Sequence, residues 1–329
     1  MTPVSLMTIV KTEKKSLSIN HNHSIMLIGS CFSEYIGEYL SENKFNICIN
    51  PTGILYNLPS IQNALTLINS DKKFTDDDLY YYQELWRSWQ HHTRFANPDK
   101  TTTLKMINDS LDNARKFFKS LDFLIITPGT SFVYFLKDTG KIIANCHRFP
   151  EKNFDRKLVT APQIVEMFSD FFTKLFVGAP KAHVIFSVSP VRHLRDSSHE
   201  NSVSKAHLIT AIYELQQRFN KVSYFPAYEI MMDELRDYRF YDEDLVHPNK
   251  TAVTYIWDKF RDAYISEKSN EFIEQYAQII ASRKHRIQYP DSESTRSFAI
   301  SGVEMVNKLS ARFPEIDLTN DRDYFSQLM

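Results

Sequence analysis

The sequence is poor in glycine and cysteine and has no long apolar run. Its 7 glycines among 329 residues are about 2% of the chain against a usual 7%, which excludes collagen-like and glycine-rich low-complexity proteins. The 3 cysteines are an odd count, so a disulfide scaffold is excluded and free thiols in a reducing, cytoplasmic setting are expected. No run approaches the roughly 18 apolar residues of a membrane span. The polar, mixed residues 1–15 predict no signal peptide.

Charge of one sign and the motifs of cofactor binding are also lacking. Lys and Arg number 39 against 40 for Asp and Glu, a net charge of −1. Such a balance lacks the basic footprint of a protein that binds nucleic acid or an anionic membrane, so neither partner is expected. There is no Walker loop, no Gly-x-Gly-x-x-Gly and no zinc-spaced cysteine set, so the sequence predicts no cofactor and no metal.

Short apolar runs that are typical of buried strands alternate with helical stripes. The runs lie at residues 24–28, 45–49, 123–126, 183–188 and 222–225. The stripes, with apolar residues three and four positions apart, lie within residues 32–40, 165–176, 208–219 and 252–260. This alternation predicts an α/β protein with a mostly parallel sheet covered on both faces. In such sheets the functional crevice lies beyond the carboxyl ends of the strands, and Gly29, Gly53 and Gly129 follow the first three runs.

Two segments interrupt the alternation and a third follows it. Residues 70–103 are first acidic and then aromatic and basic, so we interpret them as an insertion. Residues 132–146 alternate around Asp138-Thr139-Gly140, which predicts a β-hairpin. We therefore expect one domain over residues 1–265, with insertions at about 70–103 and 132–146. A helical C-terminal extension over residues 266–329 is expected to pack on this domain or to mediate homo-oligomer formation.

Ser30 and Cys31 stand where the first strand passes into the first helix. A helix N-terminus favours developing negative charge, and its free N–H groups can hold an oxyanion. The same dipole stabilises a thiolate, so Cys31 is a candidate nucleophile with a lowered pKa. An equally weighted structural interpretation makes Ser30 a helix cap and Cys31 a small buried apolar residue.

Asp244 and His247 form a second constellation, closed by Pro248 just before a helix. A carboxylate at this spacing can orient the imidazole, and His247 can then act as general base toward a nucleophile. A tetrapeptide of this kind can equally cap a helix. Its weight comes from its pairing with the nucleophile on the first strand.

Together the two motifs resemble the SGNH hydrolase superfamily. More closely, Gly29-Ser30-Cys31-Phe32-Ser33 resembles the signature of the GSCFA family, with Ser33 where alanine is usual. Further stretches that match this family lie at residues 50–54, 127–131, 145–148, 187–193 and 241–248. The resemblance covers roughly residues 20–265. It implies a three-layer α/β/α sandwich with a flavodoxin-like five-stranded sheet, and acyl-ester chemistry by hydrolysis or transfer.

The resemblance also implies roles for single residues. When the Gly-Asp-Ser block of the superfamily is laid over Gly29, Ser30 falls on the Asp and Cys31 on the nucleophile. A turn that differs by one residue makes Ser30 the nucleophile instead. Gly53 is implied as an oxyanion-hole donor through its backbone N–H.

The third block of the superfamily normally ends in an oxyanion-hole asparagine, and Gly129-Thr130-Ser131 offers none. Thr130 or Asn145 is the expected replacement donor. Losing one such donor costs about 2.7–4 kcal/mol of barrier. Because this asparagine is missing, two hypotheses remain: a weak or specialised enzyme, and a non-catalytic binder.

Other polar side chains are candidates for substrate binding. Arg192 and His193 follow the fourth strand, where Arg192 can bind an anionic substrate group or form a salt bridge in the rim. His92 lies in the aromatic insertion, which we interpret as a lid or as aromatic packing. His147 follows Cys146, but neighbours in sequence rarely have the geometry of a catalytic dyad.

Two functions therefore remain open. The first is an esterase or acyltransferase acting on a small-molecule or carbohydrate acyl ester, with an O-acetyl group as one option. The second is a non-catalytic carbohydrate- or acyl-binding module that kept the fold.

Overall fold

The computed structural model describes residues 7–12, 14, 17–193 and 195–329 of the chain. Residues 1–6, part of the segment for which no signal peptide is predicted, lie outside the described residues. The chain divides into two compact units. The first contains Ser24–Glu38 and Ile47–Lys259, and the second contains residues 17–23, Tyr39–Asn46 and Phe260–Met329.

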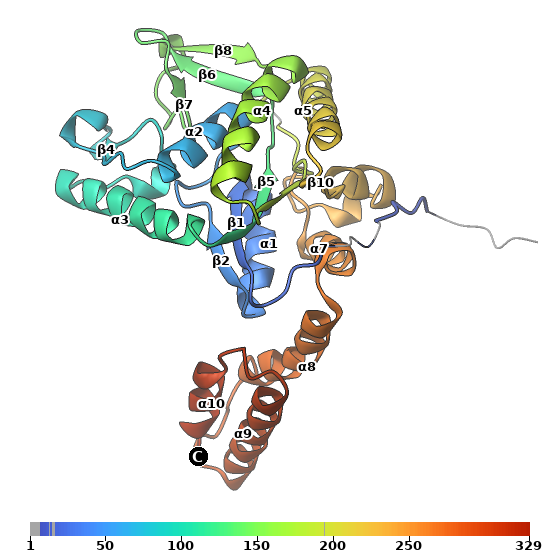
Figure 1. Cartoon of the computed structure of the whole chain (residues 1–329). Helices are drawn as coiled ribbons and strands as arrows, with labels where there is room; N and C mark the ends of the chain where they lie inside the picture. Colours follow the sequence, from blue (N-terminus) through green and yellow to red (C-terminus); the bar gives the residue numbers. More distant parts are fainter. Residues whose placement is uncertain (1–6, 13, 15–16, 194) are drawn as a thin grey trace, which may run out of the picture. The chain divides into compact units, whose positions relative to one another are not determined.

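A five-stranded sheet forms the centre of the first unit (Figure 1). Its order is β10-β9-β5-β1-β2, the expected flavodoxin-like arrangement. The strands are β1 (Ser24–Gly29), β2 (Asn46–Ile49), β5 (Leu121–Thr127), β9 (His183–Phe186) and β10 (Val222–Tyr224). The pairs β1–β5, β5–β9 and β9–β10 are parallel. The apolar runs of the sequence predict all five strands because buried parallel strands are apolar on both faces.

Helices cover both faces of this sheet, as the sequence predicts. One apolar core joins alternate strand residues such as Met26 and Leu124 to the helices α2 (Leu58–Ile68), α3 (Lys100–Phe118), α4 (Ala161–Gly178) and α5 (Ser198–Arg218). The intervening residues Ile25 and Ile125 are also buried and point to the opposite face. The buried sides of α1 (Cys31–Glu42) and α7 (Lys250–Tyr264) supply the remaining layer. A short helix, α6 (Ala227–Glu229), follows β10.

The two interruptions form small sheets of their own. The strands β3 (Tyr80–Tyr82) and β4 (Leu85–Arg87) make an antiparallel hairpin in the first insertion. The predicted second hairpin is present as β6 (Phe132–Leu136) and β7 (Ile142–Ile143), with Gly140 in its turn at φ +64°. A further strand, β8 (Phe154–Leu158), pairs with β6 and was not predicted, since Asp155, Arg156 and Lys157 break its apolar pattern.

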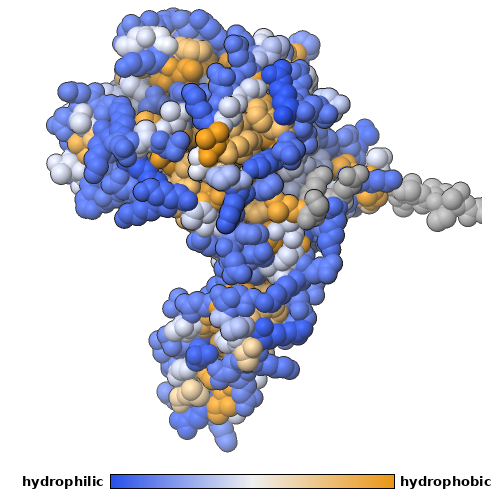
Figure 2. Space-filling view, viewed as in Figure 1, coloured by the Kyte–Doolittle hydropathy of each residue, from blue (hydrophilic) through white to orange (hydrophobic). Residues whose placement is uncertain are grey.

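The second unit is helical, as expected for the C-terminal region. It contains α8 (Glu267–Arg283), α9 (Glu293–Arg312) and α10 (Thr319–Ser326). Phe272 and Phe325 are fully buried in it, and Gly302 lets α9 approach the Phe325 ring, which an added Cβ would meet at 2.2 Å. In the space-filling view, hydrophilic residues cover most of the visible surface, with hydrophobic residues gathered in patches between them (Figure 2).

Candidate active site

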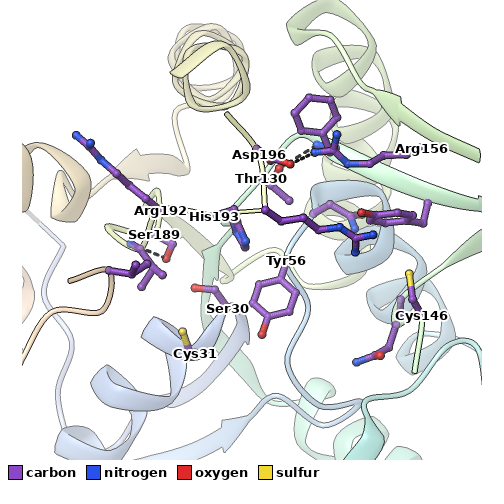
Figure 3. Close-up of a pocket in the computed structure, with 18 of the residues that line it drawn as sticks. Ser30, Cys31, Tyr56, Thr130, Cys146, Arg156, Ser189, Arg192, His193 and Asp196 are labelled. Carbon is purple, nitrogen blue, oxygen red and sulfur yellow. Dashed lines mark hydrogen bonds and ion pairs between the residues drawn. The ribbon is translucent and has the colours of Figure 1, made fainter. Parts of the chain in front are cut away.

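A cavity of about 520 Å³ opens in the first unit beyond the carboxyl ends of the central strands (Figure 3). Several separate segments build its wall, because parallel strands bring their following loops to one edge of a sheet. The lining residues predicted from the sequence are Ser30, Cys31, Thr130, Asn145, Arg192, His193, Asp244 and His247. The structure thus brings the segments around residues 30 and 245 together at one cavity.

Ser30 and Cys31 lie side by side at the start of α1, with His193 and Tyr56 near Ser30 (Figure 3). Gly29 has a φ of +148°, and a Cβ there would lie 2.3 Å from the Thr127 carbonyl oxygen, so this turn needs glycine. The Ser30 N–H donates to that same carbonyl at 2.9 Å. The end of β5 therefore fixes the residue that precedes Cys31.

The surroundings of Cys31 have opposing effects on its thiol. Burial raises its pKa, and hydrogen bonding from the Phe32 backbone N–H partly offsets this. The expectation of a net lowering by the helix N-terminus is therefore wrong, because desolvation outweighs the helix N–H groups. The Ser30 hydroxyl is buried and has no hydrogen-bond partner among the described residues.

Asp244 and His247 form a hydrogen-bonded pair on the cavity wall. Nδ1 of His247 lies 2.6 Å from Oδ2 of Asp244. The other oxygen, Oδ1, accepts from the backbone N–H groups of Val246 and His247, each at 2.9 Å. These bonds, with the His247 backbone first, lower the pKa of Asp244 to about 2. An ionised Asp244 holds the proton of His247 on Nδ1, which leaves Nε2 as an acceptor.

The expected oxyanion-hole donors do not all reach the cavity. The Gly53 N–H donates to the Asn50 carbonyl at 2.7 Å, and Gly53 is not among the lining residues. Gly53 is therefore corrected as a donor, since its N–H is already bound within its own turn. Thr130 and Asn145 do line the cavity. The Thr130 hydroxyl lies 3.0 Å from the Ser204 hydroxyl.

Asn57 is a cavity residue that the sequence did not predict. It lines the cavity as the N-cap of α2, where its Oδ1 accepts from the Ser60 N–H at 2.8 Å. No hydrogen bond of the described chain uses its Nδ2, which leaves an amide donor for a ligand. An asparagine before Leu58-Pro59 is a helix-start signal, so Asn57 was recognisable from the sequence as a cap but not as a cavity residue.

The opposite wall is rich in arginine. Arg156 pairs with the half-buried Asp196, and Arg195 pairs with Glu151. Arg192 has no carboxylate partner among the described residues, and its side chain points away from Ser30 and Cys31 (Figure 3). It is a residue of the cavity rim rather than of the reacting centre.

His193 is held as a neutral imidazole on the cavity wall. Burial lowers its pKa to about 4, and Lys205, His247 and Arg156 act in the same direction. Its Nε2 would lie 2.8 Å from a Cβ on Gly129, so that glycine makes room for the ring. A neutral imidazole can offer a polar contact to a substrate without adding charge.

The structure does not bring His92 or His147 to the cavity wall. Both ring nitrogens of His147 have partners, the Thr93 hydroxyl at 3.1 Å and the Ser88 carbonyl at 2.9 Å. His147 is also buried, so its assignment as a substrate contact is corrected. His92 packs with its Cβ against Gly53, which an added Cβ on the glycine would meet at 2.1 Å.

No cluster of three or more His, Cys, Asp or Glu side chains with metal-binding geometry occurs in the described ranges. No helix in the part of the chain that the structure covers is both long and apolar enough to cross a membrane.

Comparisons with known proteins agree with the motifs. The model of the GSCFA family matches residues 24–260, and the model described as the GSCFA domain protein C-terminal domain matches residues 276–329. No curated protein sequence matches the chain.

Among solved structures, the chain is similar to an acetyl xylan esterase from Butyrivibrio proteoclasticus, with a TM-score of 0.37 and 13% identity over 80% of this chain and 66% of that one. It is also similar to a family two carbohydrate esterase from Clostridium thermocellum, with a TM-score of 0.37 and 11% identity over 78% and 65%. A carbohydrate esterase family 3 protein from Talaromyces cellulolyticus has a TM-score of 0.37 and 11% identity over 77% and 98%.

Proposed function

The chain belongs to the GSCFA family, and we propose that it is an esterase or acyltransferase that forms a covalent acyl-enzyme on Cys31. The observation that carries this proposal is the pairing of Asp244 with His247 at 2.6 Å on the wall of the cavity that Cys31 also lines. A nucleophile, a base and a group that orients the base are the parts that covalent acyl transfer needs.

The reaction proceeds in two halves. Nε2 of His247 takes the thiol proton as the sulfur of Cys31 attacks the ester carbonyl carbon and forms the carbon–sulfur bond. The carbon–oxygen ester bond then breaks, and the departing alcohol takes the proton back from His247. Water or an acceptor alcohol next attacks the thioester with His247 as base, which releases the acyl group and restores the thiol.

The negative charge on the carbonyl oxygen needs donors. The free Nδ2 of Asn57 supports a role as one, and the Thr130 hydroxyl and the Asn145 amide are further candidates on the same wall. The first N–H groups of α1 supply the dipole end at which such charge is stabilised. These donors replace the Gly53 N–H, which is bound elsewhere.

The substrate is a small-molecule or carbohydrate acyl ester, with an O-acetyl group as the simplest acyl unit. A cavity of about 520 Å³ lies within the range of pockets that bind small molecules. His193 on the wall and Arg192 at the rim are proposed to contact the part of the substrate that does not react. Water and an alcohol both fit as the final acceptor.

The test is turnover of p-nitrophenyl acetate together with mass spectrometry of the quenched protein. We expect a burst of nitrophenol and one acetyl group on the peptide that contains Cys31. His247→Ala should lower turnover by about 10²- to 10⁴-fold, the usual contribution of a general base. Unchanged turnover in this variant would contradict the assignment of His247.

Ser30 is the alternative nucleophile, and two variants separate it from Cys31. Cys31→Ala should abolish the acetyl-enzyme, whereas Ser30→Ala should retain it. The reverse result would assign the reaction to Ser30, whose hydroxyl is without a partner among the described residues.

The engaged N–H of Gly53 favours a second candidate, a binding module that lost part of its oxyanion hole. This candidate predicts no acetyl-enzyme on either residue, while acetylated oligosaccharides still bind in calorimetry.

A further inference from the structure

Lys205 is a fully buried lysine beside the candidate active site. It lies on α5, the residue is 1% exposed, and its Nζ donates to the Ser189 carbonyl at 2.6 Å. The ammonium also lies over the Tyr228 ring, 5.5 Å from the centroid. No carboxylate of the described chain lies within ion-pair distance of Lys205. A buried ammonium with one carbonyl and one ring face as partners is an unusual arrangement.

Burying a lysine ammonium without a carboxylate partner lowers the stability of the folded protein. Burial disfavours its charged form and lowers the pKa of Lys205 to about 7. The groups whose charge acts on it are Cys31 from α1, which as a thiolate favours the protonated amine, and Arg192 from the loop after β9, which opposes it. A leucine or methionine would fill the same space at no electrostatic cost, so packing alone does not account for the charge.

Backbone hydrogen bonds at the end of β5 connect the acceptor of Lys205 with the residue before the nucleophile. Ser189, which holds the ammonium, donates its N–H to the Pro128 carbonyl at 2.9 Å. Ser30, which precedes Cys31, donates its N–H to the carbonyl of the adjacent Thr127 at 2.9 Å. Two consecutive peptide groups at the end of β5 therefore hold the lysine's acceptor and the nucleophile's neighbour.

The preceding residue of α5 fixes the same wall. The Ser204 hydroxyl accepts from the Ser131 N–H at 2.8 Å and lies 3.0 Å from the Thr130 hydroxyl. The polar face of α5 is thus docked onto the loop after β5. A charge carried on this face has little freedom to move away from the reacting centre, which is the condition for electrostatic preorganisation.

We propose that Lys205 is a positioning residue whose buried ammonium stabilises the negative charge that forms on Cys31 when the thiol proton passes to His247. This inference rests on the proposed function, since it assigns Lys205 to the same nucleophile. Lys205 forms no bond to the substrate, and the thiolate in turn favours the protonated form of Lys205. It acts through the low-dielectric interior, where an opposite charge has a far larger effect than it has in water.

The test measures the pH profile of Cys31 alkylation by iodoacetamide, followed by mass spectrometry of the Cys31 peptide. Two neutral variants are compared with the wild type. Lys205→Gln keeps a donor for the Ser189 carbonyl, and Lys205→Met keeps only the length of the side chain. We expect both to slow alkylation at and below neutral pH, where Lys205 carries its proton, by about tenfold for each unit by which the ammonium lowers the pKa of Cys31. Lys205→Arg, which restores a cation, should move the profile back toward that of the wild type.

Lys259→Met is the matched control. Lys259 is a mostly buried lysine of the same unit that pairs with Glu234 at 3.0 Å and has no contact with the cavity wall. The Lys259→Met protein should be less stable, and its Cys31 alkylation profile should be the same as that of the wild type. If the two Lys205 neutral variants behave like this control, with lower thermal stability and an unchanged profile, Lys205 only ties down the Ser189 loop and the inference is overturned.

Alkylation does not depend on ester turnover, so the two proposals can fail separately. A displaced profile in a protein that never forms an acetyl-enzyme would support the role of Lys205 and contradict the esterase. If an acetyl-enzyme forms but the Cys31 profile is the same in the Lys205 variants, the esterase proposal is supported and the role of Lys205 is contradicted.

Discussion

Oδ2 of Asp244 lies 2.6 Å from Nδ1 of His247, while Oδ1 of the same carboxylate accepts from the backbone N–H of His247 at 2.9 Å. One side chain therefore holds both the ring and the main chain of the candidate base. Leu245 between them has a φ of +57°, which turns the chain back so that both contacts form. Oδ2 contacts the ring and Oδ1 contacts the main chain, so a substitution that changes only one of these atoms tests the two contacts separately.

Asp244→Asn should lower turnover of p-nitrophenyl acetate by about 10²- to 10⁴-fold while the fold is kept. The asparagine Oδ1 can still accept from the backbone N–H groups, but its Nδ2 donor faces Nδ1 and forces the imidazole proton onto Nε2. A protonated Nε2 cannot accept the proton of Cys31. Steady-state kinetics and thermal unfolding of the variant test this directly.

Glu243→Gln is the control for that substitution, because it removes a neighbouring exposed carboxylate outside the cavity. Its turnover should match that of the wild type. Equal losses in both variants would mean that the loop charge matters and that the hydrogen bond from His247 to Asp244 does not.

Asn57→Asp should reduce kcat by about 10²- to 10³-fold with little change in KM. The aspartate keeps the cap on the Ser60 N–H, because Asp and Asn are about equally good N-caps. It replaces the Nδ2 donor with a carboxylate oxygen that repels the oxyanion. Steady-state turnover of p-nitrophenyl acetate over a range of concentrations gives kcat and KM separately.

Asp99→Asn makes the reverse exchange at the N-cap of α3, where Asp99 accepts from the Thr102 N–H at 2.6 Å outside the cavity wall. This variant should keep full activity. An Asn57→Asp protein that is as active as this control would remove Asn57 from the oxyanion hole.

The five central strands and the helices α1, α4, α5 and α7 follow from apolar periodicity, because each buries an apolar face against its neighbours. The strand β8 does not, since Asp155 and Lys157 lie on the exposed side of an edge strand. The pair Asp244 and His247 was recognisable because the two residues are close in sequence.

The other residues of the candidate site could not be recognised from the sequence. Asn57 and Arg156 line the cavity only through tertiary folding, which also forms the bond of Lys205 to Ser189 of its wall, and no local pattern marks these residues. Lys205 sits in a helix whose other charged residues are solvated, so nothing in the sequence signals its burial. The pKa of Cys31 failed as a prediction for a related reason, since the sequence shows the helix start but not the depth of burial.

Gly29→Ala should destabilise the first unit by about 2–3 kcal/mol or prevent folding. The new Cβ would lie 2.3 Å from the Thr127 carbonyl oxygen, a backbone atom that cannot move without breaking the register of β1 and β5. The free energy of unfolding in urea measures the effect. Gly178→Ala is the control, because nothing lies within 4 Å of its added Cβ, and it should be neutral or slightly stabilising. Equal stability of the two variants would contradict the close packing at Gly29.

The stability of the protein should fall as the pH rises from about 9 to about 11, and Cys48 should account for part of that fall. Burial raises the pKa of Cys48 from 9.0 to about 11, against a weaker opposing effect of Arg94. Between these values the unfolded chain has lost the thiol proton and the folded chain retains it, so raising the pH favours unfolding.

Cys48→Ala removes this linkage. The drop in unfolding free energy from neutral pH to about pH 11 should be smaller in the variant by on the order of 2 kcal/mol. Urea titrations at both pH values measure the two drops, and the pH-independent cost of the lost sulfur cancels in their difference. Equal drops in the two proteins would mean that the Cys48 thiol is hydrated in the folded state.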